Sequence, residues 1–285
     1  MKRLLILGGD GMLGHQLLKT LSARHDARVS LRQPLSRYAS HGLFTEANSF
    51  PEVVATDRDR LTDILAQFRP HVVINAIGIV KQRAAAKDSI PSLEVNSLLP
   101  HRLVSLASLV DARVIHFSTD CVFSGRKGDY SETDVADAED LYGRTKLLGE
   151  ISYANALTLR TSIIGRELGR NASLVEWFLG ERGAVRGFRR AIYTGFTTLE
   201  ISRIVEMLIT QHPQAHGLWH VSSEKISKYA LLLLLRKYYG LDTQIIPDDE
   251  FACDRSLDSS RFRKTFGYTP PSWEQMIAEL AAPQG

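Results

Sequence analysis

Residues 3–21 read RLLILGGDGMLGHQLLKTL, and this stretch decides the fold. Its apolar start, Arg3 to Leu7, is typical of a strand buried in a parallel sheet. Glycines then follow the pattern G-x-x-G-x-x-G, at Gly8, Gly11 and Gly14. From Met12 to Leu21 the leucines recur at helical spacing. Strand, glycine turn and helix together predict a dinucleotide-binding turn, in which the backbone approaches a pyrophosphate at the helix N-terminus.

Strands and helices keep alternating through the first 165 residues. The sequence predicts further strands at 27–31, 72–76, 113–117 and 157–162, and helices at 57–68 and 92–110. We expect Thr56 or Asp57 to cap the first of these helices. Residues 33–51 show no clear periodicity and support no assignment. The alternation indicates an α/β fold with a doubly wound parallel sheet of the Rossmann type.

Beyond residue 165 the alternation loosens. We expect helices at 173–181, 198–211, 226–239 and 273–280, and a strand at 218–222. We interpret residues 1–165 as a dinucleotide-binding domain, which gains later sheet strands from about 190–222. Residues 166–285 then form a smaller, mixed and interleaved substrate-binding lobe.

Composition narrows the classes of function. Among 285 residues, 35 basic and 32 acidic side chains leave a net charge of +3, too balanced to indicate nucleic-acid binding. The two cysteines, Cys121 and Cys253, suggest no disulfide framework and fit a reducing cytoplasm. The leucine run 231–235 is far shorter than the ~20 apolar residues of a membrane span. Nine histidines show no metal-ligand spacing, so we expect no metal, and His116 is expected to be a hydrogen-bonded core residue.

A second set of residues suits proton transfer. Ser118-Thr119-Asp120 follows the strand at 113–117, and Tyr142 stands four residues before Lys146, on the same face of a helix. A free tyrosine has a pKa near ~10, which an ammonium one turn away would lower. The Thr119 hydroxyl could hold a substrate oxygen against the phenol. Such a set suits a proton moving on or off an alcohol or ketone oxygen, although the Tyr/Lys spacing alone also fits a solvated helix face.

Taken in order, these motifs resemble the extended short-chain dehydrogenase/reductase superfamily. They are Gly8-x-x-Gly11-x-x-Gly14, Asn75-Ala76, Ser118-Thr119-Asp120 and Tyr142-x-x-x-Lys146. More narrowly, residues 118–125, 142–150 and 160–162 look like dTDP-4-dehydrorhamnose reductases and related nucleotide-sugar 4-keto reductases. The resemblance implies NAD(P)H-dependent reduction of the C4 ketone of a nucleotide-linked 4-keto-6-deoxy sugar, for cell-surface polysaccharide. It implies a cytoplasmic enzyme and leaves a homodimer open.

The resemblance also implies roles for individual residues. Tyr142 would donate the proton, Lys146 would hold the nicotinamide ribose and tune Tyr142, and Thr119 would hydrogen-bond the substrate carbonyl, with Asp120 beside it. The cofactor would be bound by Gly8, Gly11, Met12, Leu13, Gly14, Asn75, Ala76, Ile77, Gly78, Tyr142 and Lys146, with Ala76, Ile77 and Gly78 on its ribose side.

Four basic residues are further candidates. Arg32 ends the second strand, where an acid would bind a ribose 2′-hydroxyl and a base a 2′-phosphate, so NADP(H) is favoured over NAD(H). Lys81 could contact the substrate or its phosphates, and fits a solvated loop lysine equally well. Arg255 and Arg261 could bind the pyrophosphate of the nucleotide with their planar guanidinium groups.

Other activities are open. Ile163 stands where the rhamnose branch has an aromatic residue, and Gly195-Phe196-Thr197-Thr198 where it has Gly-x-Pro-Thr, so the sugar is in doubt. A reductase of a UDP-linked 2-acetamido-2,6-dideoxy-4-hexulose, an epimerase of the same superfamily and a non-catalytic NAD(P)-binding regulatory subunit remain alternatives. A dehydratase would need Glu after Asp120, where this chain has Cys121, and no histidine near Cys121 supports a nucleophilic cysteine.

Overall fold

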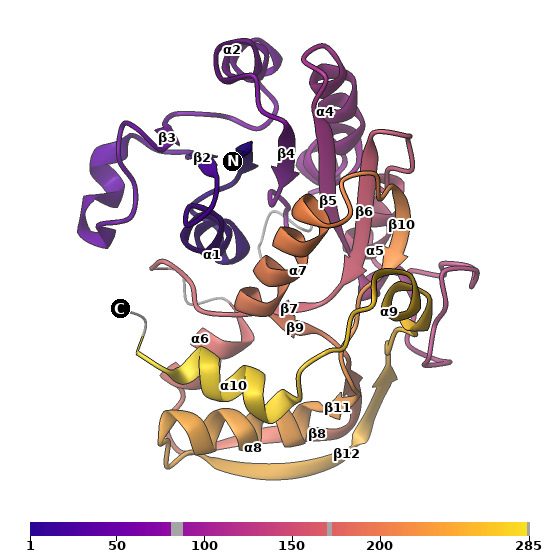
Figure 1. Cartoon of the computed structure of the whole chain (residues 1–285). Helices are drawn as coiled ribbons and strands as arrows, with labels where there is room; N and C mark the ends of the chain where they lie inside the picture. The colour runs from indigo at the N-terminus through magenta and orange to yellow at the C-terminus, as the bar shows by residue number, and fades with distance from the viewer. Residues whose placement is uncertain (81–87, 170–172, 284–285) are drawn as a thin grey trace.

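Seven parallel strands form the central sheet in the part of the chain that the structure, a computed structural model, describes: residues 1–80, 88–169 and 173–283 (Figure 1). Their order across the sheet is β10-β6-β5-β4-β1-β2-β3. Their bounds are β1 (Arg3–Leu7), β2 (Asp26–Ser30), β3 (Ser49–Phe50), β4 (Val72–Asn75), β5 (Arg113–Thr119), β6 (Ala156–Thr161) and β10 (Gly217–His220). The order reverses direction at β1, as in a doubly wound fold, and the expected fold class is confirmed.

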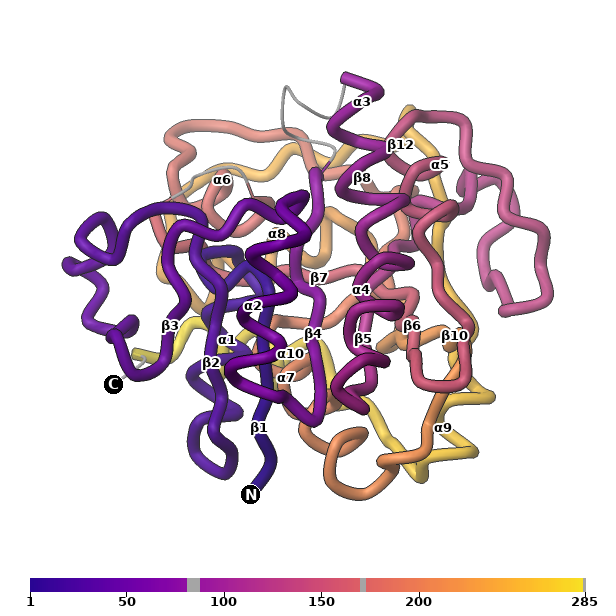
Figure 2. The backbone as a smooth tube through the Cα atoms, turned by 90° about the horizontal axis from the view of Figure 1, so that it is seen from above, coloured from indigo at the N-terminus to yellow at the C-terminus, as the bar shows by residue number. Residues whose placement is uncertain are grey.

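Helices cover both faces of this sheet because its strands are apolar on both sides. Along β1, Leu4 and Ile6 pack with the helices α1 (Met12–Leu21) and α7 (Thr198–Thr210). The alternate residues Leu5 and Leu7 pack with α2 (Arg58–Phe68) and α4 (Leu99–Ser108) on the other face. Figure 2, a view from above, shows the strands side by side from β3 on the left to β10 on the right, with α2 and α4 lying across them.

The structure corrects the single helix expected at 92–110. This segment is a short helix α3 (Ser89–Ser92), a wide π-helical turn η3 (Leu93–Leu98) and then α4. Pro100 has no N–H to bond the carbonyl of Asn96 four residues earlier, so the helix cannot close a regular turn there. Gly149 packs against this carbonyl, and a Cβ at Gly149 would lie 1.9 Å from the Asn96 oxygen. The other N-terminal elements lie close to their expected positions, and Asp57 caps α2 by accepting from Arg60 N at 3.0 Å.

A second, smaller lobe lies below the main sheet in Figure 1. Its sheet has the order β11-β8-β12, with β11 (Ile226–Ser227), β8 (Ala184–Tyr193) and β12 (Gln244–Asp254). It also contains α6 (Leu174–Gly180), α8 (Lys228–Tyr239), which packs on β8, and α10 (Trp273–Ala281), which packs on α8. The sequence did not predict β8 and β12, because arginines and exposed polar residues interrupt their apolar pattern.

Two connections join the lobe to the main sheet. The strand pair β7 (Ile163–Ile164) and β9 (Phe196–Thr197) lies between them, and α9 (Ser260–Phe266) contacts β10. Within residues 190–222, only β10 joins the seven-stranded sheet, whereas β8 belongs to the lobe and α7 covers the main sheet.

The remaining elements are η1 (Leu35–His41), η4 (Asp120–Val122) and α5 (Leu141–Leu148). In the described part of the chain, no helix has both the length and the apolar character to cross a membrane.

A buried ion pair near the carboxyl end of β5 links side chains of β5, β6 and β10. Arg160 on β6 binds Glu150 with two bonds of 2.7 Å, and both side chains are less than one-tenth exposed. Ser118 on β5 donates to the same carboxylate at 2.6 Å. Arg160 Nη1 also lies 3.2 Å from Nε2 of His220 on β10. Burial lowers the pKa of His220, so its neutral ring can accept this bond. One carboxylate therefore connects three neighbouring strands.

We expect Arg160→Met to destabilise the fold by roughly 3–5 kcal/mol, because it leaves the Glu150 carboxylate buried without its counter-charge. Urea unfolding measures this change. Arg126→Met is the matched control, since Arg126 pairs with Glu139 on the surface with both side chains exposed, and it should leave the unfolding midpoint unchanged. Equal stability of the two variants would contradict the importance of the buried pair.

Candidate active site

The glycine turn after β1 forms a cradle that only glycines can line. Gly8 has a φ of +86°, and its carbonyl accepts from Gly11 N at 3.0 Å. A Cβ at Gly14 would lie 2.0 Å from the Gly8 oxygen, which is backbone and cannot move aside easily. A Cβ at Gly8 itself would lie 2.9 Å from Cγ1 of Ile77 at the end of β4. The turn therefore lies directly against the residues that follow β4.

The N-terminus of α1 is open to an anion. The helix begins after Gly11, no described side chain caps it, and its first turn carries no acidic residue. The first N–H groups of a helix have no partner inside it and carry a partial positive charge. The N–H groups of Met12 and Leu13 are thus the donors that a phosphate requires. The glycine cradle and the uncapped helix fit the pyrophosphate of a dinucleotide.

The end of β4 supplies the neighbouring wall. Asn75 is buried, and its Oδ1 accepts from Ile77 N at 3.2 Å. Ala76, Ile77 and Gly78 follow, each half-buried, and Ala76 N donates to Leu7 O at 3.1 Å. These three residues run beside the glycine cradle, where the sequence analysis expected the ribose side of a cofactor.

Thr119, Asp120 and Tyr142 meet at the carboxyl end of β5. Thr119 is buried, donates to Asp120 Oδ1 at 3.1 Å and accepts from Cys121 N at 3.1 Å. The phenol of Tyr142 lies close enough to Thr119, Cys121 and Asp120 for all three to act on its pKa. The hydroxyl and the phenol, 23 positions apart in the chain, are therefore together. This is the convergence that a proton-transfer site needs.

The pKa of Tyr142 shifts in the direction opposite to the expectation. Burial raises the pKa of this phenol well above its usual value, and nearby Cys121 and Asp120 raise it further, against the hydrogen bond with Thr119. The expectation that Lys146 lowers the pKa of Tyr142 is wrong in this structure. The Lys146 amine bonds the Phe117 carbonyl instead, at 2.6 Å. Tyr142 is consequently protonated at neutral pH, the form that can donate a proton.

Lys146 is buried inside the main domain. Burial lowers its pKa from 10.5 to about 8, and Glu150 partly opposes this shift. Its Nζ lies 3.5 Å from Nε2 of His116, which is buried on β5 and bonded to Asn75. His116 is thus the hydrogen-bonded core residue that the sequence analysis expected. An amine with a pKa near neutral can hold or release a proton at physiological pH.

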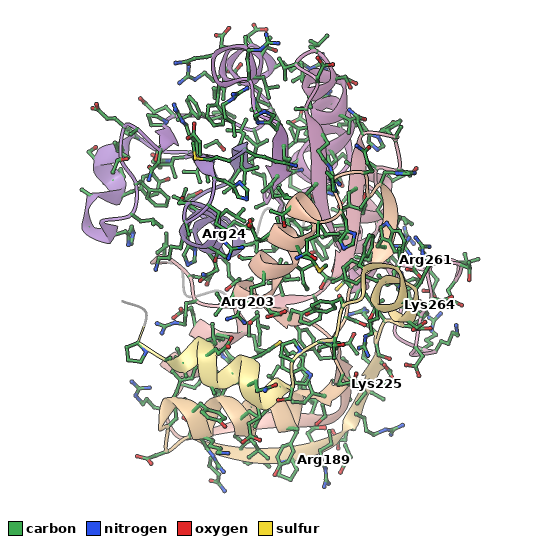
Figure 3. All side chains as sticks on the ribbon, viewed as in Figure 1. Arg24, Arg189, Arg203, Lys225, Arg261 and Lys264 are labelled. Atoms are coloured by element: carbon green, nitrogen blue, oxygen red, sulfur yellow. The ribbon has the colours of Figure 1, made fainter. Side chains whose placement is uncertain are left out.

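The candidate arginines lie in different places. Arg255 is beside the site: its Nε donates to Phe123 O at 2.8 Å, and Nη1 lies 3.8 Å from Cys121 Sγ. Arg261 on α9, labelled in Figure 3, is engaged elsewhere. It covers the ring of Trp219 at 3.8 Å and donates to Leu218 O. The structure thus separates Arg261 from the group formed by Thr119, Tyr142 and Arg255. Lys81 lies outside the described residues.

Asn96 is a residue of the site that the motif analysis did not single out. From the wide turn η3 its amide accepts from Ile79 N at 2.9 Å and donates to Ile79 O at 3.0 Å. It also donates to Thr145 Oγ1 at 3.3 Å, on the helix of Tyr142. Asn96 therefore connects the loop after β4 with α5 through hydrogen bonds. In the sequence, Asn96 could have been recognised as an asparagine four residues before a proline inside an expected helix.

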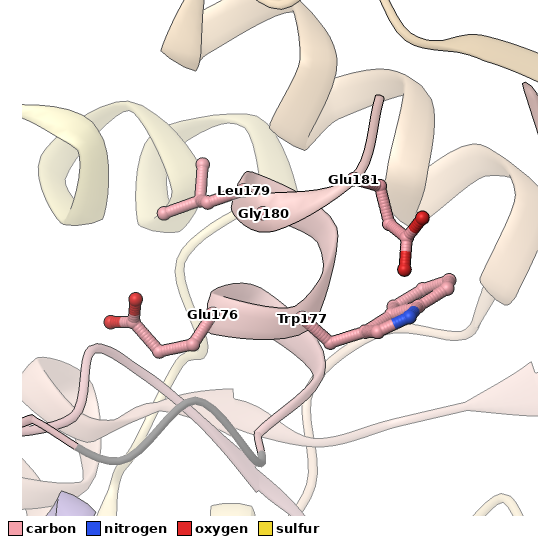
Figure 4. Close-up of a pocket in the computed structure, with 5 residues that line it drawn as sticks. All are labelled: Glu176, Trp177, Leu179, Gly180 and Glu181. Carbon is pink, nitrogen blue, oxygen red and sulfur yellow. The ribbon is translucent and has the colours of Figure 1, made fainter. Parts of the chain in front are cut away.

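Three other features lie outside this proton-transfer set: a hollow on α6, the potential metal ligands and the thiol of Cys121. Figure 4 shows a hollow on α6 lined by Glu176, Trp177, Leu179, Gly180 and Glu181. None of the candidate catalytic residues lines it. Among the described residues, no group of three or more His, Cys, Asp or Glu side chains is arranged to hold a metal ion. Burial raises the pKa of the Cys121 thiol to about 12, so it is not a ready nucleophile.

The family described as RmlD substrate binding domain matches residues 1–284. The chain belongs to the RmlD substrate binding domain family. A dTDP-4-dehydrorhamnose reductase of Aggregatibacter actinomycetemcomitans is 26% identical to it, over 99% of each chain.

Two solved structures share the RmlD-family fold of this chain. The Bacillus anthracis dTDP-4-dehydrorhamnose reductase in complex with NADP superimposes with a TM-score of 0.80 at 21% identity, covering 98% of each chain. The Bordetella bronchiseptica enzyme WbmG in complex with NAD has a TM-score of 0.78 at 18% identity, covering 98% of this chain and 93% of its own.

In this RmlD-family chain we expect Lys146→Met to stabilise the fold at pH 7 by about 1–3 kcal/mol, because a buried charge is removed. The folded pKa of Lys146, about 8, lies below its unfolded value. Between the two, the unfolded state binds more protons, so wild-type stability rises with pH from about 8 to about 10.5. The advantage of the variant should therefore shrink across that range.

Urea unfolding at pH 7 and pH 10 measures this effect. Lys264→Met, at an exposed lysine on α9 labelled in Figure 3, is the control and should show neither the gain nor its pH dependence. If Lys146→Met behaved like this control, the amine would not be strained by burial.

Proposed function

We propose that this chain reduces the C4 ketone of a nucleotide-linked 4-keto-6-deoxy sugar with a nicotinamide cofactor. The observation that carries the proposal is the meeting of Thr119 with a protonated Tyr142 at the end of β5, on the same sheet edge as the glycine cradle. The relative from Aggregatibacter, which matches this chain end to end, bears the name of such a reductase.

The chain's residues handle the substrate oxygen and its proton. Thr119 donates a hydrogen bond to the carbonyl oxygen, which positions it against the phenol. The cofactor, when bound, supplies a hydride to the carbonyl carbon. Tyr142 gives its proton to the oxygen, so that the ketone, the hydride and one proton together become an alcohol. Lys146, with a pKa of about 8, can hold a proton nearby at neutral pH.

The cofactor site is assigned to residues that fit it. Gly8, Gly11 and Gly14 would admit the pyrophosphate, and the N–H groups of Met12 and Leu13 would bind it. Ala76, Ile77 and Gly78 would border the ribose. Lys146 would bind the nicotinamide ribose through its amine.

We favour NADP(H) over NAD(H) because of Arg32. This residue is exposed just after β2, and among the described residues it makes no ion pair. A guanidinium there can bind a 2′-phosphate. The structural relatives do not decide between the cofactors, since one contains NADP and the other NAD.

We expect Arg32→Ala to lower kcat/KM for NADPH at least about tenfold, equivalent to ~1.4 kcal/mol, while kcat/KM for NADH stays the same. Steady-state rates with both cofactors measure this. Arg24→Ala is the control. Arg24 follows the C-terminus of α1, at the end of the helix away from the glycine cradle, and it pairs with Glu206. A wild-type preference for NADH would refute the assignment.

The substrate is assigned more coarsely. Arg255, half-buried beside Cys121, is the described arginine best placed to bind the pyrophosphate of a sugar nucleotide. Ile163, at the position of an aromatic residue in the rhamnose branch, is half-buried and packs against the core. The chain therefore lacks that ring at position 163, and the sugar can differ from the rhamnose precursor.

The test is to offer the purified protein dTDP-, UDP- and GDP-linked 4-keto-6-deoxy sugars while following NAD(P)H absorbance. We expect one cofactor oxidised per sugar reduced. Tyr142→Phe should lower kcat ~10²–10⁴-fold, because it removes the proton donor.

Tyr153→Phe is the control for this variant, since Tyr153 is exposed and its hydroxyl contacts His101. It should retain the wild-type rate. Conversion of the sugar without net cofactor consumption would indicate an epimerase. Full biological activity of Tyr142→Phe would instead favour a binding role.

A further inference from the structure

The amide of Asn75 has a fixed orientation. Its Oδ1 accepts from the backbone N–H of Ile77 at 3.2 Å, and a backbone nitrogen can only donate. The other end of the amide, Nδ2, must therefore face away from Ile77. It lies 3.1 Å from Nδ1 of His116, and both side chains are 1% exposed. Asn75 consequently donates to His116.

This orientation determines the tautomer of His116. A neutral imidazole has one N–H and one acceptor nitrogen. Burial lowers the pKa of His116 well below 6.5, and Lys146 and His101 lower it further, so the ring is neutral. Because Nδ1 accepts from Asn75, the ring proton is on Nε2.

The Nε2–H of His116 faces the amine of Lys146. The two nitrogens are 3.5 Å apart, and Lys146 also donates to Phe117 O at 2.6 Å. If Lys146 is an ammonium, this N–H faces another donor and has no acceptor. If Lys146 is a neutral amine, the N–H can donate to the lone pair of the amine nitrogen. The buried N–H therefore distinguishes the two protonation states of the lysine.

We propose that His116 is a positioning residue, locked by Asn75 with its proton on Nε2, which favours the neutral amine of Lys146. A chain of three side chains then connects the end of β4, beside the cofactor cradle, to the lysine on α5. This role rests on the proposed function, in which Lys146 is part of the site, but its test does not require turnover.

Other charged groups around this pair act from different elements. Glu150 after α5 favours the ammonium, but Arg160 on β6 and Ser118 bind its carboxylate. His101 on α4 acts on His116. Tyr142, one turn before Lys146, is protonated and carries no charge at neutral pH. Within this set, His116 is the group closest to the amine that can present an N–H to it.

The first measurement reads the tautomer in the full-length, cofactor-free wild-type protein. Nitrogen NMR with ¹⁵N-labelled histidine, assigned by the signal lost in His116→Leu, distinguishes a proton on Nδ1 from one on Nε2. We expect the neutral Nε2–H form throughout pH 6–9. A proton on Nδ1, or an imidazolium that titrates in this range, would overturn the proposal. This result requires no folded variant beyond the assignment.

The second measurement changes the tautomer. Asn75→Asp places an acceptor at Nδ1, so the ring proton moves there and the Nε2 lone pair faces Lys146. Carbon NMR of ¹³C-labelled lysine, assigned with Lys146→Arg, should show the pKa of Lys146 rise by at least about one, a tenfold change in proton affinity.

A double-mutant cycle separates the imidazole from the new charge. In a His116→Leu background, Asn75→Asp should raise the pKa of Lys146 by less than half as much, because no ring remains to switch. An equal rise in both backgrounds would mean that the introduced carboxylate acts directly on the amine, and would overturn the proposal. His101→Gln is the control for loss of a nearby histidine and should leave the titration of Lys146 unchanged. Failure of the proposed reductase activity would leave all of these results intact.

Discussion

The bond between Lys146 Nζ and the carbonyl of Phe117 is the interaction on which the arrangement of the site depends. It draws the side chain of a helical residue into the edge of the central sheet, where burial is nearly complete. Helix α5 is thereby fixed against β5, and Tyr142, one turn earlier, is brought to Thr119. A lysine free in solvent would leave the phenol without a fixed position over the end of the strand.

Polar residues at the centre of the sheet come with partners on every side. Ser118 binds Glu150, Glu150 binds Arg160, and His116 binds Asn75. Burying such groups is unfavourable unless their hydrogen bonds are satisfied. The carboxyl ends of β4, β5 and β6 are therefore connected by side chains as well as by backbone ladders. The residues proposed to bind the cofactor and the substrate are held in place by that network.

Much of this arrangement could be predicted from the sequence, because local patterns encode it. The glycine turn, the apolar strands and the residues following β4 and β5 each have short-range signals, and parallel strands bring their ends together. The upward shift of the Tyr142 pKa could not be predicted, since it depends on burial and on Cys121 and Asp120 in the folded chain. Nor could the place of Arg261, whose partner Trp219 is 42 positions away. The strands β8 and β12 were missed because each pairs with a distant segment and exposes many polar residues.

The wide turn at residues 93–98 acts as a one-residue insertion in an otherwise continuous helical segment. An extra residue changes the angular phase by ~100°, since an α-helix has 3.6 residues per turn. Side chains before and after the turn therefore point in different directions around the helix axis. The amide of Asn96, inside the turn, does not lie on the same helix face as the side chains of its neighbours. Pro100 supplies no N–H to the Asn96 carbonyl, and Gly149, which has no Cβ, leaves the space that this carbonyl occupies. The residues at positions 96, 100 and 149 thus depend on one another. A substitution at one of them changes which residue types fit at the other two.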